Sequence, residues 1–351
     1  MRDGRYGSGD AGDGAGRKAV LVALQELTFT SANGRDTVQA WVYEPVGTPT
    51  AVVQVVHGLG EHSRRYLHLT STLLDAGFVV VADDHAGHGR TAMGSGVWAD
   101  AGDDAARVVV ADALQVQAEA REALPRLTGL PWVVYGHSWG SMIARAMATD
   151  ERSVPLAGLV LGGIAAQMHG IEEVVDRAAL AELAAGDHAA EPVPDLLVGQ
   201  LFDGFLDRFG PGAGPTAWVA LDAEVVADHG RDPFNNFGAP LSARFLQGFV
   251  DLYDQANGDD WYATLPAWLP VLVLAGDQDP VANYGGGAYH VANRLVASGH
   301  PDVRTRVFPG VRHEVHNEPT TRAEAEHEIT EFVARVSARP APAASPAPAP
   351  A

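Results

Sequence analysis

Short apolar runs alternate along the chain with longer amphipathic stretches. The apolar runs are expected to be buried strands, at residues 51–56, 78–82, 132–135, 157–161, 271–275 and 303–308. The longer stretches are expected to be helices, at residues 64–76, 103–126, 139–150, 285–298 and 320–337. This order predicts an α/β fold, with a mostly parallel central sheet flanked by helices.

Two segments depart from this rhythm. Residues 25–44 alternate between apolar and polar positions around Asn33 and Gly34, which predicts an antiparallel hairpin before the parallel sheet. Residues 164–265 contain few strand-like runs and are expected to form an inserted, mainly helical cap. Four apolar cap residues at i, i+4 spacing are typical either of a helix that packs on the core or of a lid that lines an apolar tunnel. These are Leu197, Leu201, Phe205 and Phe209.

Composition supports one core domain. The chain has 351 residues, of which 46% are hydrophobic, so residues 19–163 and 266–338 are expected to form one large buried core. Residues 1–18 are rich in Gly and Asp, and residues 339–351 in Pro and Ala, so both ends are expected to be disordered. The chain has no cysteine, which excludes disulfides, thiol catalysis and zinc–thiolate sites.

Charge limits the possible partners. The formal net charge of −20 disfavours binding to nucleic acids and to anionic membranes. No apolar stretch is long enough to span a bilayer, and nothing resembles a signal peptide, so a cytoplasmic location without stable membrane insertion is expected. The sequence leaves the oligomeric state open.

A candidate nucleophile lies between a predicted strand and a predicted helix. Residues 136–140 read Gly-His-Ser-Trp-Gly. A serine on a sharp strand-to-helix turn exposes its Oγ, and flanking glycines avoid collisions with the neighbouring elements. The pattern alone also fits an ordinary glycine-rich turn. Its setting favours Ser138 as a nucleophile.

Two later predicted strands end in an acid and a base. Asp279 follows one strand and His313 the other, at the sheet edge where α/β proteins place their sites. His313 would take the proton of Ser138, and Asp279 would orient the imidazole. Asp277 is a rival acid; Asp279 is preferred because Asp-Pro-Val places it beyond the strand end.

An acyl-transfer site also needs N–H donors for a developing oxyanion. The residue after the nucleophile, Trp139, supplies one backbone N–H. Leu59, in the glycine-rich loop that follows the strand at 51–56, is assigned as the second donor.

The histidine-rich stretches do not fit metal motifs. His313 and His316 are spaced i, i+3, whereas the zinc-binding helix pattern needs i, i+4. Asp277 and Asp279 begin like a calcium loop, but Pro280 follows. We therefore expect no metal and no cofactor.

Five blocks of sequence together resemble the monoacylglycerol lipases and related lysophospholipases of the α/β-hydrolase superfamily. They are His-Gly-Leu-Gly-Glu-His-Ser-Arg-Arg-Tyr at 57–66, Asp-His-Ala-Gly-His-Gly-Arg-Thr at 84–91, and the stretches 136–141, 276–281 and 312–318. The resemblance covers about residues 26–163 and 266–337 and leaves the cap unaligned.

The resemblance implies a serine hydrolase that cleaves monoacylglycerols or lysophospholipid-like single-chain esters through an acyl-enzyme. It also implies a polar pocket for the alcohol head group, formed by Glu61, Arg65 and His316. The alternatives are that Glu61 and Arg65 form only a local i, i+4 ion pair and that His316 only caps its loop.

Other functions use the same residues. A general carboxylesterase or a thioesterase needs no change in the triad. A non-catalytic ligand-binding protein on this fold is a further alternative, although such proteins usually lack the histidine that stands here at His313.

Overall fold

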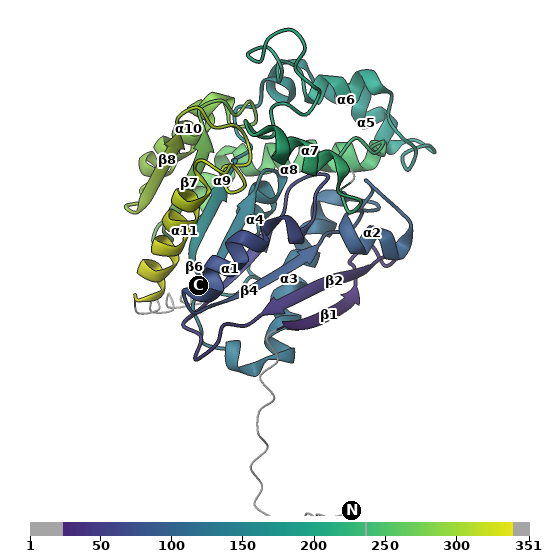
Figure 1. Ribbon diagram of the computed structural model, residues 1–351. Coiled ribbons are helices and arrows are strands. Elements are labelled where there is room, and N and C mark those ends of the chain that lie inside the picture. The colour runs from purple at the N-terminus through teal and green to yellow at the C-terminus, as the bar shows by residue number, and fades with distance from the viewer. Residues whose placement is uncertain (1–23, 236, 340–351) are drawn as a thin grey trace, which may run out of the picture.

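The computed structural model describes residues 24–235 and 237–339. Its strands are β1 (Leu24–Thr30), β2 (Thr37–Tyr43), β3 (Ala51–Val56), β4 (Phe78–Asp84), β5 (Trp132–His137), β6 (Leu156–Gly162), β7 (Val271–Gly276) and β8 (Val303–Phe308). They form one sheet in the order β1-β2-β4-β3-β5-β6-β7-β8 (Figure 1). The pairs β1–β2 and β2–β4 are antiparallel, and the pairs from β4 to β8 are parallel. The predicted hairpin and mostly parallel sheet are confirmed.

Helices connect the strands and cover the sheet. Outside the insertion they are α1 (Leu67–Asp75), α2 (Gly89–Ser95), α3 (Ala105–Ala123), α4 (Trp139–Thr149), α10 (Gly286–Ala297) and α11 (Arg322–Ser337). All five helices expected from the sequence in this part are present within a few residues of their predicted ends. The short helix α2 was not predicted, because it contains Gly at two of its seven positions, and Gly disfavours helix formation.

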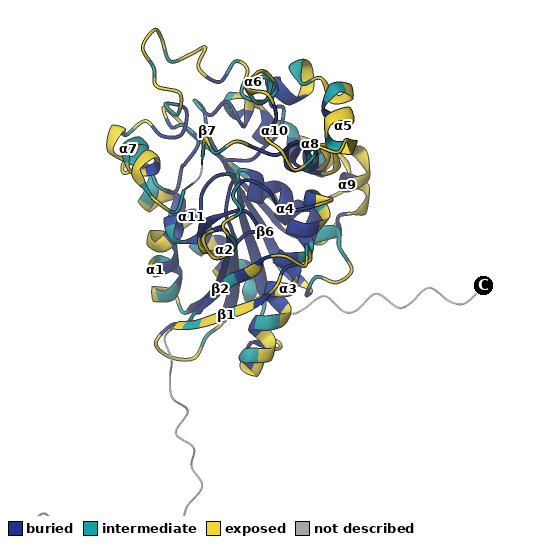
Figure 2. Ribbon diagram, turned by 90° about the vertical axis from the view of Figure 1, so that its right-hand side faces the viewer, coloured by how far each residue is buried: buried dark blue, intermediate teal, exposed yellow. Residues whose placement is uncertain are grey.

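The sheet is buried on both faces, as parallel sheets are (Figure 2). Alternate residues of β3 point to opposite sides: Val52 and Val56 pack with the helices α3 and α4, whereas Val53 and Val55 pack with α1 and α11. Every residue of β3, β4, β5 and β7 is buried, whereas the edge strands β1 and β8 are partly exposed. The site loops therefore rest on a rigid support.

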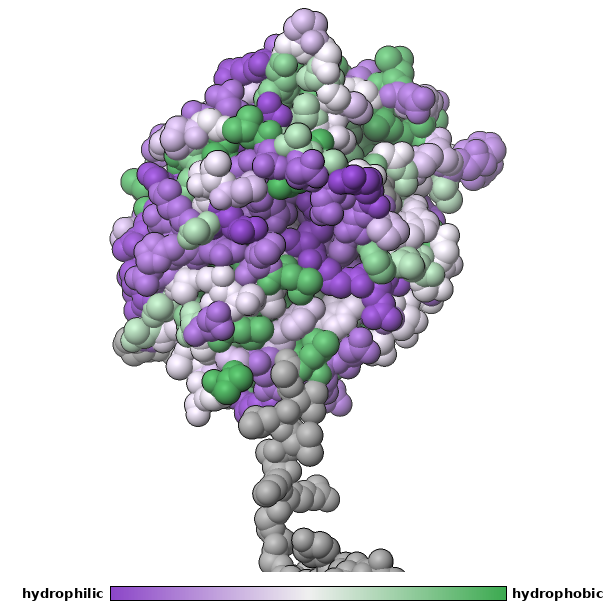
Figure 3. All heavy atoms as spheres, viewed as in Figure 1, coloured by the Kyte–Doolittle hydropathy of each residue, from purple (hydrophilic) through white to green (hydrophobic). Residues whose placement is uncertain are grey.

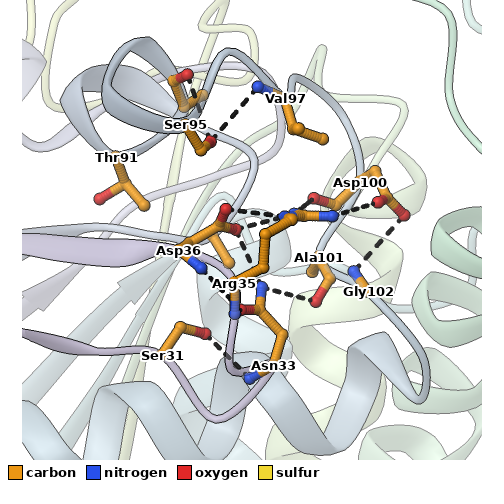
Figure 4. A network of polar contacts seen from close by, with 12 residues as sticks. Ser31, Asn33, Arg35, Asp36, Thr91, Ser95, Val97, Asp100, Ala101 and Gly102 are labelled. Carbon is orange, nitrogen blue, oxygen red and sulfur yellow. Dashed lines mark hydrogen bonds and ion pairs between the residues drawn. The ribbon is translucent and has the colours of Figure 1, made fainter.

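An ion-pair network fastens the hairpin to the body of the protein. Arg35 lies between the carboxylates of Asp36 and Asp100 (Figure 4) and donates to Asp100 at 2.7 Å. Asp100 also accepts from Arg244 at 2.6 Å and from the hydroxyl of Ser242 at 2.8 Å. Burial alone would raise the pKa of Asp100, but the hydrogen bonds from Arg244 and Arg35 outweigh it and lower the pKa to about 2.

The segment between β6 and β7 is mainly helical. It contains a π-helical turn η3 (Gly170–Val174) and the helices α5 (Arg177–Ala185), α6 (Asp195–Leu201), α7 (Ala223–Arg231), α8 (Ala243–Asn257) and α9 (Asp259–Thr264). The helices α5, α6 and α7 lie above the sheet in Figure 1, whereas α8 packs against α3 and α4. The boundaries 164–265 of the cap stay a prediction, since the end of this segment packs on core helices.

The apolar stripe of the cap is not one helix. Helix α6 ends at Leu201, and residues 202–209 form successive turns. Gly204 adopts φ 77°, a left-handed conformation that stops a helix. Leu201 and Phe205 are nevertheless buried, so the stripe still packs inward.

Among the described residues, no helix is long and apolar enough to cross a membrane. The face seen in Figure 3 is largely hydrophilic, with apolar residues dispersed over it. The segment 1–18, which is predicted to be disordered, lies outside the described residues. The same holds for the predicted segment 339–351, except for Arg339.

Candidate active site

Ser138 stands on a sharp turn between β5 and α4. Its backbone has φ 55° and ψ −123°, which a residue with a side chain rarely adopts. The N–H of Ser138 donates to the carbonyl of Gly162 at 3.0 Å, which ties the turn to the neighbouring strand β6. A Cβ on Gly140 would overlap the carbonyl oxygen of Val56, so only glycine fits there. This is the geometry expected of a nucleophile elbow.

The acid and base candidates meet at the ends of β7 and β8. Nδ1 of His313 lies 3.0 Å from Oδ2 of Asp279, and both side chains are almost fully buried. The second oxygen of Asp279 accepts from the N–H of Val281 at 2.9 Å. Burial lowers the pKa of His313, but the charge and hydrogen bond of Asp279 outweigh it and raise the pKa above its ordinary value.

Asp277, the rival acid, has another partner. Its Oδ1 accepts from the N–H of Gly310 at 2.7 Å, in the turn between β8 and His313. Asp277 therefore fixes the histidine loop, and Asp279 is the carboxylate that contacts the imidazole.

Ser138 and His313 line one small cavity of about 30 Å³. Most of its other walls are apolar side chains from the cap and from helix α8: Met168, Phe202, Phe205, Trp218, Val219, Phe237 and Phe249. The ring of Trp218 lies 5.1 Å from that of His313. Apolar side chains therefore surround the nucleophile, while Ser138 itself stays partly exposed.

The two expected oxyanion donors have free N–H groups. Within the part of the chain that the structure describes, no acceptor bonds the backbone N–H of Leu59 or of Trp139. Leu59 lines the cavity, and Trp139 directly follows Ser138. The adjacent Gly58 N–H is already used, since it donates to Oε1 of Glu61 at 2.5 Å.

The three predicted head-group residues are placed differently. Glu61 lines the cavity, whereas Arg65 and His316 do not. Oε1 of Glu61 also accepts from the hydroxyl of Tyr66 at 2.5 Å, and Oε2 lies 3.4 Å from Nε of Arg65. The i, i+4 ion pair considered from the sequence is thus present.

His316 lies behind the cavity wall. Its ring stacks on Tyr66 with centroids 4.6 Å apart, and its Nδ1 is 3.3 Å from the hydroxyl of Tyr135. Burial lowers the pKa of His316 to about 3, so this side chain is neutral.

Sequence reasoning missed two polar residues of the cavity, Glu314 and His229. Glu314 accepts from Arg65 through both carboxylate oxygens. Burial would raise the pKa of Glu314, but the charge of Arg65 outweighs burial, and the pKa of Glu314 is lowered. The pKa of Glu61 is raised, because Glu61 is buried and lies close to the charge of Glu314. Glu314 directly follows His313 in the sequence, so its place at the site could have been predicted. For His229, on α7, the sequence gives no such signal.

The histidine loop is fastened to the cap on both sides of His313. Arg312 donates to carbonyl oxygens within residues 217–220, at 2.5 and 2.9 Å. The buried carboxylate of Glu318 accepts from the backbone N–H groups of residues 221–222, at 2.7 and 3.0 Å. This part of the cap is therefore built into the site.

Among the described residues, no group of three or more His, Asp or Glu side chains is placed to hold a metal ion. His57 and His85 stack with centroids 3.8 Å apart near Trp139, and Asp83 bonds His85 at 2.8 Å. These histidines support the loops under the elbow.

The sheet order, the elbow after β5 and the acid and base after β7 and β8 define an α/β-hydrolase. The profile of the family described as "Serine aminopeptidase, S33" matches residues 47–320, and the chain belongs to this family. It is an ester-hydrolysing enzyme of the monoglyceride lipase type.

Three relatives illustrate the similarity. The monoacylglycerol lipase of Mycolicibacterium smegmatis is 31% identical over 290 residues, 79% of this chain and 86% of that protein. A solved lipase in an open form is 59% identical with a TM-score of 0.86, covering 90% of this chain and all of that one. A thermostable carboxyl esterase from Bacillus coagulans, solved with glycerol, is 41% identical with a TM-score of 0.85 and the same coverage.

Proposed function

We propose that Ser138, His313 and Asp279 form the catalytic triad of an esterase acting on monoacylglycerols or similar single-chain esters. The observation that carries the proposal is that Ser138 and His313 line the same cavity while the imidazole of His313 is hydrogen-bonded to Asp279. Oγ of Ser138 attacks the ester carbonyl while His313 takes its proton. His313 then gives this proton to the leaving alcohol. A water, activated by the same imidazole, hydrolyses the acyl-enzyme.

The N–H groups of Leu59 and Trp139 stabilise the oxyanion in this proposal. Preorganised donors of this kind contribute about 3–4 kcal/mol each to transition-state stabilisation. Two observations support this role of the two N–H groups. Neither N–H has a competing acceptor among the described residues, and Glu61 fixes Gly58, which precedes Leu59.

A second cavity supports an acyl chain as part of the substrate. It has a volume of about 470 Å³ and shares Leu59, Phe202, Phe205, Trp218 and Phe237 with the serine cavity. Its remaining lining is mostly apolar cap residues, among them Val193, Val198, Leu206, Pro215 and Leu241. Apolar pockets of this size bind hydrocarbon by excluding water.

Glu61 supports a polyol alcohol as the head group. Its Oε2 is buried and has no hydrogen-bond partner among the described residues, and Glu61 lines the serine cavity. Apart from its ion pair with Arg65, this oxygen is available to accept a hydrogen bond from a glycerol hydroxyl. Arg65 then supports Glu61 directly, and His316 supports it through Tyr66. A relative solved with glycerol and another named monoacylglycerol lipase agree with this assignment.

A general carboxylesterase is the second candidate, favoured by the small serine cavity and by the similarity to a carboxyl esterase. The cytoplasmic location expected from the sequence stays a prediction.

Labelling and a matched substrate panel test the proposal. The purified enzyme should react stoichiometrically with a fluorophosphonate probe, and Ser138→Ala should abolish labelling and lower kcat by about 10⁴–10⁶. The panel pairs 1-monoacylglycerols with p-nitrophenyl esters of the same chains. Retention of more than a few per cent of kcat by Ser138→Ala contradicts the triad. A kcat/KM that does not favour glycerides indicates the carboxylesterase.

A further inference from the structure

The loop that carries the acid is strained where it leaves the site. After Asp279 the chain forms a short 3-10 turn, η4 (Asn283–Gly285). Asn283 and Tyr284 have φ 45° and 56°, two consecutive left-handed residues that carry side chains. The N–H of Tyr284 donates to the carbonyl of Asp279 at 2.7 Å. Strain of this kind persists only where the surroundings enforce it, and it is concentrated at functional sites.

The strained conformation directs Tyr284 to the cap. Its hydroxyl donates to the carbonyl of Gly204 at 3.3 Å, and the guanidinium of Arg208 lies 3.4 Å from the centre of its ring. Asn283 donates at 3.5 Å to Gln167, a further left-handed residue, at the start of the cap. The acid loop thus contacts the cap at two points.

The turn that Tyr284 contacts, residues 202–209, forms part of the wall of the serine cavity. Phe202 and Phe205 belong to this turn and line both the serine cavity and the apolar groove of 470 Å³. They pack on Trp218 with ring centroids 6.2 and 5.1 Å away. Trp218 itself is held by the histidine loop, whose His313 N–H donates to its carbonyl at 3.3 Å. These aromatic rings separate the nucleophile from the groove.

We propose that Tyr284 is a specificity-determining residue that holds the turn 202–209 over the serine cavity and thereby limits the entry of long acyl chains into the groove. The inference rests on the proposed function, since it takes the groove as the acyl site. A hydrogen bond and a cation–π contact together are expected to shift the population of the closed turn by up to about tenfold.

Two variants separate the contacts. Tyr284→Phe removes only the hydroxyl, whereas Tyr284→Gly removes the ring and also relieves the backbone, because glycine adopts positive φ freely. Tyr289→Phe is the matched control, since Tyr289 lies exposed on α10. The readout is kcat/KM for p-nitrophenyl laurate and p-nitrophenyl butyrate.

We expect kcat/KM for the laurate to rise about threefold in Tyr284→Phe and up to about tenfold in Tyr284→Gly, through a lower KM. The butyrate and the control should change less than twofold, since a short chain does not need to extend past Phe202 and Phe205 into the groove. Equal changes for both esters, or an unchanged chain-length ratio in Tyr284→Gly, would overturn the proposal.

A second measurement does not depend on activity. The chain has no cysteine, so an introduced Asp207→Cys can be spin-labelled selectively on the exposed side of the turn. The label should become more mobile in the Tyr284→Gly background and stay unchanged with Tyr289→Phe. If the label stays immobile in Tyr284→Gly, Tyr284 does not hold the turn 202–209. Failure of the proposed function has a different signature, because Ser138 would then not react with the fluorophosphonate whatever the mobility of the label.

Discussion

Nη2 of Arg65 donates to both carboxylate oxygens of Glu314, at 2.9 and 2.6 Å, and both side chains are almost inaccessible to solvent. The pair joins the segment after the oxyanion loop to the residue beside His313. Removing one partner of a buried ion pair typically costs about 3–5 kcal/mol. Arg65 therefore connects the segment after the glycine-rich loop to the loop of His313, and it does not line the serine cavity.

Glu61 should show a selective effect on the alcohol. Glu61→Gln keeps an oxygen for Gly58 and Tyr66 but replaces the second carboxyl oxygen, which has no hydrogen-bond partner among the described residues. We expect kcat/KM for a monoacylglycerol to fall by a factor that corresponds to a loss of about 1–3 kcal/mol in transition-state stabilisation. For a p-nitrophenyl ester of the same acyl chain, kcat/KM should change little. Equal losses on the two esters would mean that Glu61 acts only through the oxyanion loop.

Substitutions of the two aspartates after β7 should lower kcat to very different extents. Asp279→Asn is expected to lower kcat by about 10⁴, because the amide favours the wrong tautomer of His313. Asp277→Asn keeps an oxygen for the N–H of Gly310 and should lower kcat less than tenfold. Steady-state kinetics on one soluble ester compares them, and the reverse order would show that the wrong carboxylate was assigned.

The acidic limb of the pH profile should report His313. The base must be neutral to accept the proton of Ser138, so kcat/KM falls as the pH drops through the pKa of His313. Because Asp279 raises that pKa, the limb should lie above the ordinary histidine value of 6.5. In Asp279→Asn the residual activity should have its limb at lower pH. A limb that stays in place would contradict the coupling.

Asp100 should contribute stability that acid removes. Its pKa is lowered in the folded protein, so its contribution is complete above about pH 4 and is lost as the pH falls towards 2. Allowing for partial solvent screening, we expect Asp100→Asn to lower the free energy of unfolding by about 1–2 kcal/mol at pH 7, measured by urea denaturation. The difference from wild type should shrink at pH 3. The exposed Asp103, which also pairs with Arg244, provides a control in Asp103→Asn, where little change is expected.

Local patterns predicted the sheet well. Apolar runs located every parallel strand, and Asn33–Gly34 located the hairpin, because these signals depend on neighbouring residues. The pairing of Asp279 with His313 followed from a topological rule, since strand ends share one edge of the sheet.

The cap was predicted less well, because its structure depends on distant contacts. Gly204 ends the helix expected through Phe209, although the spacing of apolar residues continues past it. Trp218 reaches His313 through the backbone of the cap, and no periodicity in the sequence signals such a contact.

The attachment of the cap by Arg312 and Glu318 bears on how this enzyme can be recombined with its relatives. Both residues lie in the C-terminal part of the core sequence. Their side chains hydrogen-bond to backbone groups of residues 217–222, and Arg312 makes one further contact with a cap side chain, the ring of Phe209. Backbone partners impose a path on the chain and leave its side chains free to vary. A chimera that exchanges the inserted segment should therefore accept foreign side chains readily, provided that the grafted backbone follows the same route past the catalytic histidine.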